Sequence, residues 1–334
     1  MSLSDENMPP DRNLALELVR VTEAAALQAA RYIGMGDKEA ADQAAVDGMH
    51  AVLHTIHMDG VVVIGEGEKD EAPMLANGEV VGDGTPPQVD IAVDPLDGTR
   101  LTAQGRPNAV SVIALSERGT MFDPGPVFYM EKMAAAEGLV DLLDLDRPLG
   151  RTVELIAERR GVEVRDVMVV VLDRPRHEAG IAAIREAGAR VRLITDGDVA
   201  GALLAAAPDR PVDLLWGIGG TPEGVITAAA LKCYGGGLLG RLWPRDDDER
   251  ARAGAAGYDV GKVMTHDDLV KGSNCFFSAT GVTDGDVLRG VRYEGARGAT
   301  TESLVMRSRS GTVRRIESRH DRTKLRELTG YRYG

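Results

Sequence analysis

The segment Gln-Val-Asp-Ile-Ala-Val-Asp-Pro-Leu-Asp-Gly-Thr, residues 88–99, joins a short apolar run to a cluster of reactive side chains. Val89, Ile91 and Val93 share one face at the spacing of a β-strand, which is predicted to stop at Asp94. Two carboxylates, a glycine and a hydroxyl follow, an arrangement that suits a metal pair beside a phosphate cradle. Because open α/β sheets bind ligands at the carboxyl ends of their strands, the segment predicts an acidic ligand site at a sheet edge.

The residues on both sides of this segment predict helices stacked against a sheet. Apolar residues three or four positions apart predict a helix over Leu14–Tyr32 and a second over Asp42–Met58, which places Asp42 at a helix start. Short apolar runs predict a buried strand at Val61–Ile64 and another at Ala109–Leu115.

The second half alternates strands and helices at the spacing of βαβ units, which predicts a parallel or mixed sheet. The predicted strands are 167–172, 191–194 and 212–216, the predicted helices are 179–187, 198–206 and 222–234, and a closing antiparallel region is expected from 275–280, 303–306 and 312–316. The charged stretch Arg245–Arg252 is interpreted as a solvated loop or helix face. The predicted fold class is therefore mixed α/β.

A boundary near Asp146–Arg151 is predicted to divide the chain. Residues 1–150 would form an N-terminal metal-binding α+β half, and residues 151–334 a C-terminal α/β half that contributes substrate-binding residues and Glu223. The two halves are expected to share the active site.

The composition is that of a soluble globular protein, with 43% hydrophobic and 27% charged residues among 334. The formal net charge of −13 disfavours nucleic acid as a partner, because faces that bind DNA or RNA carry positive charge. The same charge repels a phosphate ester unless divalent cations reverse the field locally. An acidic protein that acts on phosphates is therefore expected to bind metal first.

The sequence predicts a cytoplasmic protein without a membrane partner. Residues 1–11 show neither a basic region nor an apolar core of a signal peptide, and the longest apolar runs are too short for a bilayer of about 30 Å. A homo-oligomer is expected, as for many cytosolic metabolic enzymes. Cys233 and Cys275 form no CxxC motif and no His-rich cluster accompanies them, so a disulfide framework and a zinc site are disfavoured and structural thiols are expected.

Acidic side chains stand at the ends of several predicted elements, and they are Asp42, Glu66, Glu68, Asp94, Asp97 and Glu223. Oxygen donors without His or Cys select Mg²⁺ or Mn²⁺ over zinc. Carboxylates that converge would repel one another strongly without cations, so the pattern predicts a metal centre.

Most of these carboxylates also have a structural interpretation. Asp42 fits a helix N-cap, and Glu223 fits a side chain that complements a helix dipole. Glu66 fits an exposed turn residue. The Asp-Pro-Leu-Asp-Gly-Thr unit is harder to explain in this way, because a turn accounts only for its Asp97-Gly98 dipeptide.

These strings resemble one enzyme superfamily. Asp94–Thr99, with Ile64–Glu68 upstream, resembles the lithium-sensitive inositol monophosphatases and fructose-1,6-bisphosphatases. The strings that are similar to the bacterial class II fructose-1,6-bisphosphatases are 63–75, Tyr129–Lys132, Pro175–His177, Asp196–Asp198, Trp216–Gly224 and Phe277–Gly281. The resemblance covers about Asn13 to Arg315.

The resemblance implies a layered α/β/α/β/α sugar-phosphatase fold, dependence on Mn²⁺ or Mg²⁺, and a role in gluconeogenesis. The metal ligands that it implies are Asp42, Glu66, Asp94, Asp97 and Glu223. The substrate contacts that it implies are Asp97, Gly98, Thr99, Tyr129, Arg174, Pro175, Arg176, Asp196, Gly197, Asp198 and Gly220. Many class II members carry Glu where this chain has Asp97, so the shorter side chain is expected to shift a metal slightly without removing the activity.

The implied reaction removes the C1 phosphate of fructose-1,6-bisphosphate with metal-activated water. The catalytic residues expected are Thr99, which would orient the water, and Asp42 or Glu66, which would accept its hydrogen bond, with Glu68 a weaker candidate. Guanidinium forks at Arg174 and Arg176 would hold the second phosphate. Both arginines also fit surface positions, and Tyr129 also fits a half-buried core position.

Three other functions fit the sequence less well. Sedoheptulose-1,7-bisphosphatase activity is the nearest alternative, alone or beside the fructose activity, because the C1 ends of the two substrates are alike. An inositol monophosphatase matches fewer of the strings outside the core motif. A non-catalytic metal-dependent sensor of sugar phosphates is expected to have lost Thr99 or a metal carboxylate, and all of these residues are present.

Overall fold

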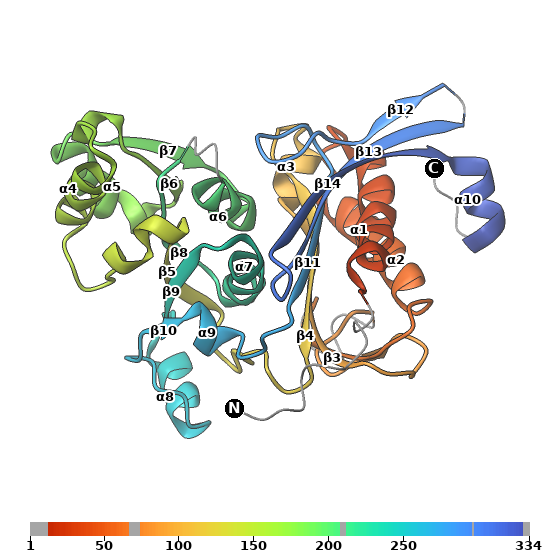
Figure 1. Cartoon of the computed structure of the whole chain (residues 1–334), viewed down its shortest axis with the longest axis horizontal. Helices are drawn as coiled ribbons and strands as arrows, with labels where there is room; N and C mark the ends of the chain where they lie inside the picture. The colour runs from red at the N-terminus through yellow and green to blue at the C-terminus, as the bar shows by residue number, and fades with distance from the viewer. Residues whose placement is uncertain (1–12, 67–73, 208–211, 296, 330–334) are drawn as a thin grey trace.

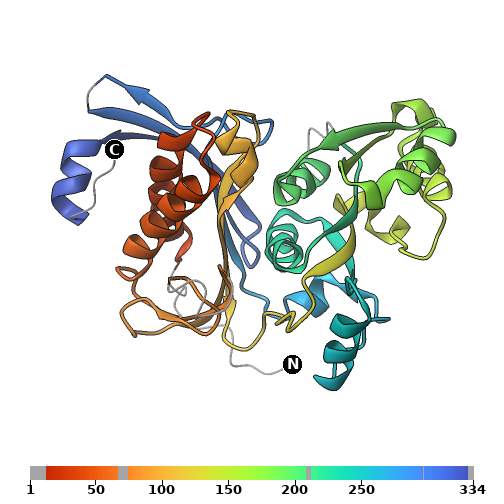
Figure 2. The ribbon, with the colours of Figure 1, turned by 180° about the vertical axis from the view of Figure 1, so that it is seen from behind.

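The computed structural model describes residues 13–66, 74–207, 212–295 and 297–329, and these form five layers. Figure 1 shows two sheets separated by a helix pair, with one further helix pair outside each sheet, and Figure 2 shows the same layers from behind. The helix pairs are α4 (Leu149–Arg160) with α5 (Glu178–Glu186), α6 (Asp198–Ala206) with α7 (Thr221–Tyr234), and α1 (Ala15–Ala29) with α2 (Lys38–Leu53). The predicted α/β/α/β/α layering is confirmed.

The larger sheet has eight strands among the described residues, and α1 and α2 cover its outer face. Its order is β12-β13-β11-β4-β3-β1-β2, and β14 pairs with β13. The strands are β1 (Asp59–Ile64), β2 (Val80–Val81), β3 (Gln88–Asp97), β4 (Val110–Glu117), β11 (Phe276–Gly281), β12 (Arg292–Glu294), β13 (Gly298–Arg307) and β14 (Thr312–Asp321). The pairs β11–β13 and β13–β14 are antiparallel, as predicted for the C-terminal strands.

The smaller sheet has six strands in the described part of the chain, in the order β10-β9-β5-β8-β6-β7. They are β5 (Tyr129–Ala135), β6 (Met168–Leu172), β7 (Arg190–Ile194), β8 (Leu214–Gly220), β9 (Gly237–Leu242) and β10 (Met264–Thr265). β6 is parallel to β7 and β8, whereas β5 is antiparallel to β8 and β9. The predicted mixed sheet is therefore present.

The start of α2 differs from the prediction. The helix begins at Lys38, and the N-cap is Asp37, whose side chain accepts a hydrogen bond from the Ala40 N–H at 3.0 Å. Asp42 lies within the helix, one turn further on, so its interpretation as a helix start and N-cap is wrong. The helix also ends at Leu53, five residues before the predicted end.

Sequence periodicity missed β5 and β9. The segment Tyr-Met-Glu-Lys-Met-Ala-Ala of β5 contains good helix formers, and its strand conformation comes from ladders with β8 and β9 on both sides. β5 joins the smaller sheet before the predicted boundary near Asp146–Arg151, and the strands after residue 275 return to the larger sheet. The position of a domain boundary stays a prediction.

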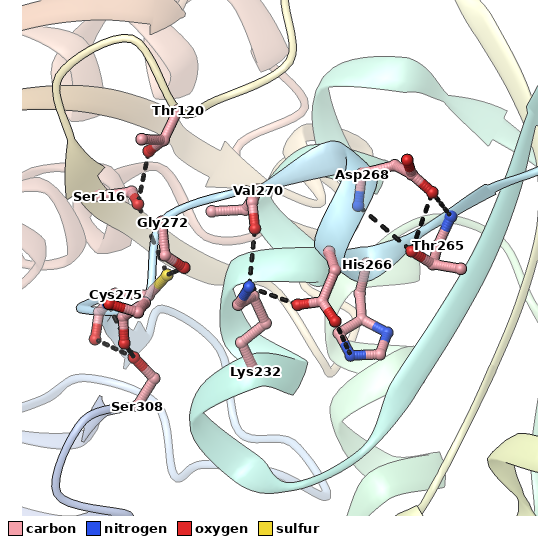
Figure 3. Close-up of polar contacts among 12 residues, drawn as sticks. Ser116, Thr120, Lys232, Thr265, His266, Asp268, Val270, Gly272, Cys275 and Ser308 are labelled. Atoms are coloured by element: carbon pink, nitrogen blue, oxygen red, sulfur yellow. Dashed lines mark hydrogen bonds and ion pairs between the residues drawn. The ribbon is translucent and has the colours of Figure 1, made fainter. Parts of the chain in front are cut away.

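In the described ranges, four further helices lie between strands or after the last strand. They are α3 (Thr99–Ala103), α8 (Asp247–Ala255), α9 (His266–Leu269) and α10 (Arg322–Thr329). Helix α7 is anchored to the chain before β11, because Lys232 Nζ donates to Asp267 at 2.5 Å and to the Val270 carbonyl at 2.8 Å (Figure 3). Among the described helices, none has the length and apolar character needed to cross a membrane.

Both cysteines are buried free thiols that pack between the layers. Cys275 Sγ lies 3.4 Å from the Gly272 carbonyl and 3.6 Å from Ser116 Oγ, and its backbone N–H donates to Ser308 Oγ at 2.7 Å (Figure 3). Burial raises the pKa of both thiols. The neutral thiols fit the predicted structural role.

Candidate active site

A cavity of about 720 Å³ collects most of the predicted carboxylates. Its lining includes Asp42, Glu66, Asp94, Asp97, Gly98, Thr99, Asp196 and Glu223. These residues come from α2, from the chain just after β1, from β3 and the start of α3, from the chain between β7 and α6, and from the start of α7. Segments of both sheets and of two helix layers therefore meet at one cavity, and the roles of the residues stay predictions.

The end of β3 delivers two carboxylates to the cavity. The register between β3 and β4 shifts between Asp94 and Asp97, so the intervening Pro95 needs no ladder hydrogen bond. Asp94 Oδ1 accepts a hydrogen bond from the Leu96 N–H at 3.1 Å, which closes this bulge. Gly98 follows with φ of 102°, a backbone conformation that favours glycine, and α3 begins at the next residue.

Thr99 and Asp42 are in direct contact across the cavity floor. Thr99 Oγ1 donates to Asp42 Oδ1 at 3.3 Å and lies 3.1 Å from the Leu96 carbonyl. Asp42 reaches this point because it lies one turn inside α2, which packs against α3. The structure thus pairs the threonine with Asp42, one of the two carboxylates proposed from the sequence.

Glu223 enters the cavity from the first turn of α7. The helix begins at Thr221 with Pro222 at its first turn, which fixes the direction of the chain. A Cβ atom on Gly220 would lie 1.8 Å from Glu223 Oε2, so glycine at this position leaves the room that the carboxylate occupies. The dipole of α7 also favours a negative charge at this end.

Burial raises the pKa of every one of these carboxyl groups, and repulsion by neighbouring acidic side chains adds to the rise. Burial raises the pKa of Glu66 to about 8, and the charges of Asp42 and Glu223 add to the shift. Burial, then Asp97 and Glu66, raise the pKa of Asp94 well above its usual range. The pKa values of Asp42, Asp97, Asp196 and Glu223 are also raised, chiefly by burial. The cavity therefore disfavours negative charge unless cations enter it.

The donor set fits hard divalent cations. Asp97 Oδ2 and Glu223 Oε2 are buried without a hydrogen-bond partner in the described residues, and such atoms are rare unless a ligand satisfies them. The five predicted ligands offer only carboxylate oxygens, which suit Mg²⁺ and Mn²⁺. Among the described residues, no three of these carboxylates have oxygens within 4.8 Å of one another. The donors therefore surround the cavity and do not form one compact group.

Lys132 is a buried cation for which the sequence analysis gave no role. Its side chain is 1% exposed, and Nζ lies 2.7 Å from Asp198 Oδ2 and 2.9 Å from the Gly220 carbonyl. The Lys132 charge opposes the rise in the pKa values of Asp97 and Glu223. The sequence offered one indication of its importance, because Lys132 belongs to the Tyr-Met-Glu-Lys motif that carried the resemblance. The sequence does not indicate which residue Lys132 contacts.

The remaining predicted substrate residues lie behind or beside the cavity. Those outside its lining are Tyr129, Arg174, Pro175, Arg176, Gly197, Asp198 and Gly220. Arg176 donates through Nε and Nη2 to the Ile218 carbonyl, at 3.2 and 2.7 Å, and stacks over Tyr129 at 4.7 Å. Burial raises the pKa of Asp196, and the charge of Arg174 opposes this rise. Glu68, a weaker catalytic candidate, lies outside the described residues.

Two arginines that the sequence assigned to a solvated stretch line the cavity wall. Arg245 and Arg252 both belong to the lining, and both remain exposed to solvent. Arg245 pairs with the buried Glu249 at 3.2 Å and stacks over Phe128 at 5.6 Å. These contacts hold the Arg245 guanidinium at the wall of the cavity.

A second cluster of possible ligand atoms lies outside the cavity lining. His50, His54 and Glu79 bring three possible ligand atoms within 4.8 Å of one another. The sequence has no His-rich cluster, and this group of two histidines and one glutamate forms only in the fold. The available signal was a pair of histidines four residues apart on a predicted helix, whereas Glu79 lies 25 residues beyond the second one.

The raised carboxyl pKa values predict an unusual pH dependence of stability. Folded Glu66 keeps a proton up to a pKa of about 8, whereas an unfolded chain loses it near 4.5. Since the folded state binds more protons between these values, the free energy of unfolding of the metal-free protein falls as pH rises across that window. In EDTA we expect Tm to be several degrees lower at about pH 8.5 than at about pH 6, by differential scanning calorimetry.

Two controls accompany this measurement. Saturating Mn²⁺ is expected to abolish most of the fall in Tm, and Glu66→Gln is expected to reduce it in EDTA. A metal-free wild-type protein that is more stable at the higher pH would contradict the electrostatic account.

A family match places this five-layer fold, with its carboxylate-lined cavity, among the phosphatases. Residues 12–320 match the model of a family described as bacterial fructose-1,6-bisphosphatase, glpX-encoded, and the chain belongs to this family. It is 47% identical over 323 residues to the class 2 fructose-1,6-bisphosphatase of Haemophilus influenzae, a match that covers 93% of this chain and 96% of that protein. It is 45% identical over 322 residues to fructose-1,6-bisphosphatase 1 class 2 of Escherichia coli K12, with 92% and 95% covered.

Proposed function

We propose that this protein hydrolyses the C1 phosphate of fructose-1,6-bisphosphate to give fructose-6-phosphate and inorganic phosphate. The family match over residues 12–320 carries the proposal, together with the carboxylate cavity that the fold assembles. The cavity volume of about 720 Å³ falls in the range of small-molecule sites. Hydrolysis breaks the bond between phosphorus and the C1 oxygen, and water supplies the oxygen gained by phosphorus.

The residues proposed to hold the divalent ions are Asp42, Glu66, Asp94, Asp97 and Glu223. Two of these, Asp97 and Glu223, have the orphaned buried oxygens that support the assignment. Bound metal ions would lower the pKa of a water molecule and neutralise charge on the phosphate and on the departing alkoxide. The protein's own part is to fix the position of these carboxylates, to orient the water and to hold the sugar.

Thr99 is the residue proposed to orient the attacking water. Its hydroxyl already donates to Asp42 Oδ1, so the oxygen lone pairs of Thr99 are free to accept a hydrogen bond from water. A proton that leaves the water would pass through Thr99 Oγ1 to the Asp42 carboxylate. Glu66 remains the alternative acceptor.

The second phosphate needs cations that bind without promoting its cleavage. Arg174 and Arg176 are proposed for this role, and Arg245 and Arg252 join them because they line the cavity. Arg176 also donates to the Ile218 carbonyl and stacks over Tyr129, so it is proposed to hold the tyrosine beside the sugar as well. The loop Asp196–Asp198 and Gly220 are proposed to shape the sugar pocket, since Asp198 is held by Lys132.

Removal of a phosphate-binding arginine should affect binding more than turnover. Arg174→Ala and Arg245→Ala are each expected to raise KM for fructose-1,6-bisphosphate about tenfold with a small change in kcat, since both contacts persist through the reaction. Steady-state kinetics under saturating Mn²⁺ checks this. The exposed Arg165, which pairs with Glu163 at 2.8 Å, provides a matched control. A change confined to kcat would contradict the assignment.

The other functions are less well supported. The family match favours the bisphosphatase over an inositol monophosphatase. Thr99 and all five proposed metal carboxylates are present, which argues against a sensor without catalysis. Activity on sedoheptulose-1,7-bisphosphate remains the nearest alternative. The proposal includes Mn²⁺ or Mg²⁺ as the ion, a cytoplasmic homo-oligomer, and a place in gluconeogenesis.

Substrate comparison tests the proposed function. Phosphate release would be measured with Mn²⁺ from fructose-1,6-bisphosphate, sedoheptulose-1,7-bisphosphate and inositol-1-phosphate at equal concentrations. We expect the highest kcat/KM for the fructose substrate and negligible release from inositol-1-phosphate. A higher kcat/KM for either of the other two substrates would replace the proposed one.

A further inference from the structure

Three side chains outside the carboxylate cavity direct their ligand atoms toward one point. The Nε2 atoms of His50 and His54 lie 3.0 Å apart. Glu79 Oε1 lies 2.8 Å from the first nitrogen and 3.6 Å from the second. Two ligands at roughly 2.05 Å from a tetrahedral zinc ion lie roughly 3.4 Å apart. The triangle therefore has about the size of one face of a tetrahedral metal site.

The two histidines converge because of their spacing on α2. Residues i and i+4 lie on the same helix face, and His54 keeps helical backbone angles as the C-cap residue. Its N–H lies 3.4 Å from the His50 carbonyl, which continues the helical pattern. The rings are 4.5 Å apart at 75°, so each presents one nitrogen to the shared point without stacking on the other.

Glu79 is fixed in place by its own segment. Its carbonyl accepts a hydrogen bond from the Val62 N–H on β1 at 2.9 Å, and its N–H donates to the Ala76 carbonyl at 3.0 Å. Its second oxygen, Oε2, accepts from the Ala76 N–H at 3.2 Å. Oε1 therefore faces the histidines from a side chain that is already fixed. Glu79 loses little conformational freedom when Oε1 binds a ligand.

Hydrogen bonding alone leaves this cluster incompletely satisfied. A neutral His50 that donates through Nε2–H to Glu79 Oε1 cannot also accept from His54 Nε2. If His54 carries its proton on Nδ1, the one proton on His50 Nε2 faces two acceptors, Glu79 Oε1 and His54 Nε2. A divalent ion accepts lone pairs from all three atoms. His50 provides a lone pair on Nε2 when its proton is on Nδ1.

We propose that His50, His54 and Glu79 bind a transition-metal ion of the Zn²⁺ type at a site separate from the carboxylate cavity. Two imidazoles and one carboxylate favour Zn²⁺, Cu²⁺, Ni²⁺ or Co²⁺ over Mg²⁺. The side chains are 24%, 40% and 18% exposed, so solvent can reach a fourth coordination position. None of the three belongs to the lining of the cavity.

The position of the site suggests what a bound ion would do. His50 and Asp42 are eight residues apart on α2, which corresponds to about 12 Å along the helix. The ion would join the end of α2 to residues 74–79, the segment that precedes β2. Within that segment, the Asn77 side chain accepts from the Gly65 N–H at 2.9 Å, next to Glu66. The expected consequence is greater stability of the wall that carries Glu66, and the inference does not depend on the substrate proposed above.

Metal binding by the full chain tests the proposal, with excess Mg²⁺ present to occupy the carboxylate cavity. One equivalent of Cu²⁺ is expected to give an electron paramagnetic resonance spectrum with hyperfine splitting from two nitrogen ligands, which a carboxylate site cannot produce. His54→Ala is expected to reduce this splitting. Splitting that is absent from wild type, or that is unchanged in His54→Ala, would overturn the proposal.

Zn²⁺ titration calorimetry in the same buffer provides the matched comparison. His54→Ala and Glu79→Gln are each expected to weaken Zn²⁺ binding at least tenfold and to remove the rise in Tm that Zn²⁺ gives wild type. His57→Ala is the control, because this nearby exposed histidine pairs with Asp83 and not with the cluster. Equal Zn²⁺ affinity in wild type, His54→Ala and Glu79→Gln would contradict the site, as would a loss in His57→Ala as large as in His54→Ala.

Discussion

An Asp94→Asn enzyme is expected to lose about 10³-fold in kcat on fructose-1,6-bisphosphate. Asp94 lies at the end of β3 among four other acidic groups, and its pKa is raised by burial and by its neighbours. Asparagine keeps the shape and the acceptor for the Leu96 N–H, but it removes the charge that would bind a divalent ion. A loss of this size is typical when charge stabilisation in an active site is removed.

The same variant separates a catalytic role from a structural one. In EDTA, Asp94→Asn is expected to unfold at the same temperature as wild type or a higher one, because the cost of holding this buried carboxyl group protonated above its usual pKa is gone. Asp90 on the same strand is a matched control, since its carboxylate accepts from the Thr120 and Met121 N–H groups at 2.8 and 3.0 Å. Asp90→Asn should lower Tm and change kcat little. Near-normal turnover in Asp94→Asn, or a Tm in EDTA well below wild type, would contradict the assignment.

Thr99→Ala is expected to lower kcat by roughly 10²- to 10⁴-fold, with a smaller effect on KM. The hydroxyl that contacts Asp42 is lost, so the attacking water is neither oriented nor connected to a proton acceptor. Thr99→Ser keeps the hydroxyl and is expected to remain within about tenfold of wild type. Single-turnover phosphate release under saturating Mn²⁺ measures the chemical step directly.

The stability of the threonine variants is the control for this prediction. Thr99 is only partly buried and its methyl group is small, so Thr99→Ala should unfold within a few degrees of wild type. Turnover close to wild type in Thr99→Ala would remove the proposed water-orienting role. An equal loss in Thr99→Ser would show that the methyl group, not the hydroxyl, is needed.

Local sequence patterns predicted the elements that bury an apolar face. The helix over 198–206 has the predicted bounds, and β3 carries Asp94 and Asp97 to a sheet edge as the alternation of Val89, Ile91 and Val93 indicated. The convergence of the carboxylates could also be anticipated, because side chains at strand ends meet at one edge of a sheet. These inferences needed only short-range spacing and one general rule of topology.

The features that sequence reasoning missed depend on contacts between distant segments. β5 is a strand because β8 and β9 pair with it on both sides, although its residues favour a helix. Lys132 forms an ion pair with Asp198, which lies 66 positions further along the chain, and no local sequence pattern predicts such a pair. Aspartate is favoured at the N-cap, so the residue type alone does not distinguish Asp37 from Asp42. Asp37 is the N-cap because its backbone is extended and its side chain accepts from the Ala40 N–H.

Phosphate release from fructose-1,6-bisphosphate after removal and return of metal tests the central claim most directly. Purified protein would be treated with EDTA, dialysed, and assayed alone, with Mg²⁺ and with Mn²⁺. The account predicts no release without metal, restored release with at least one of the two ions, and no restoration in Asp94→Asn. Release from the metal-free enzyme at the restored rate, or full restoration in Asp94→Asn, would contradict the claim that the carboxylate cavity is a metal-dependent phosphatase site.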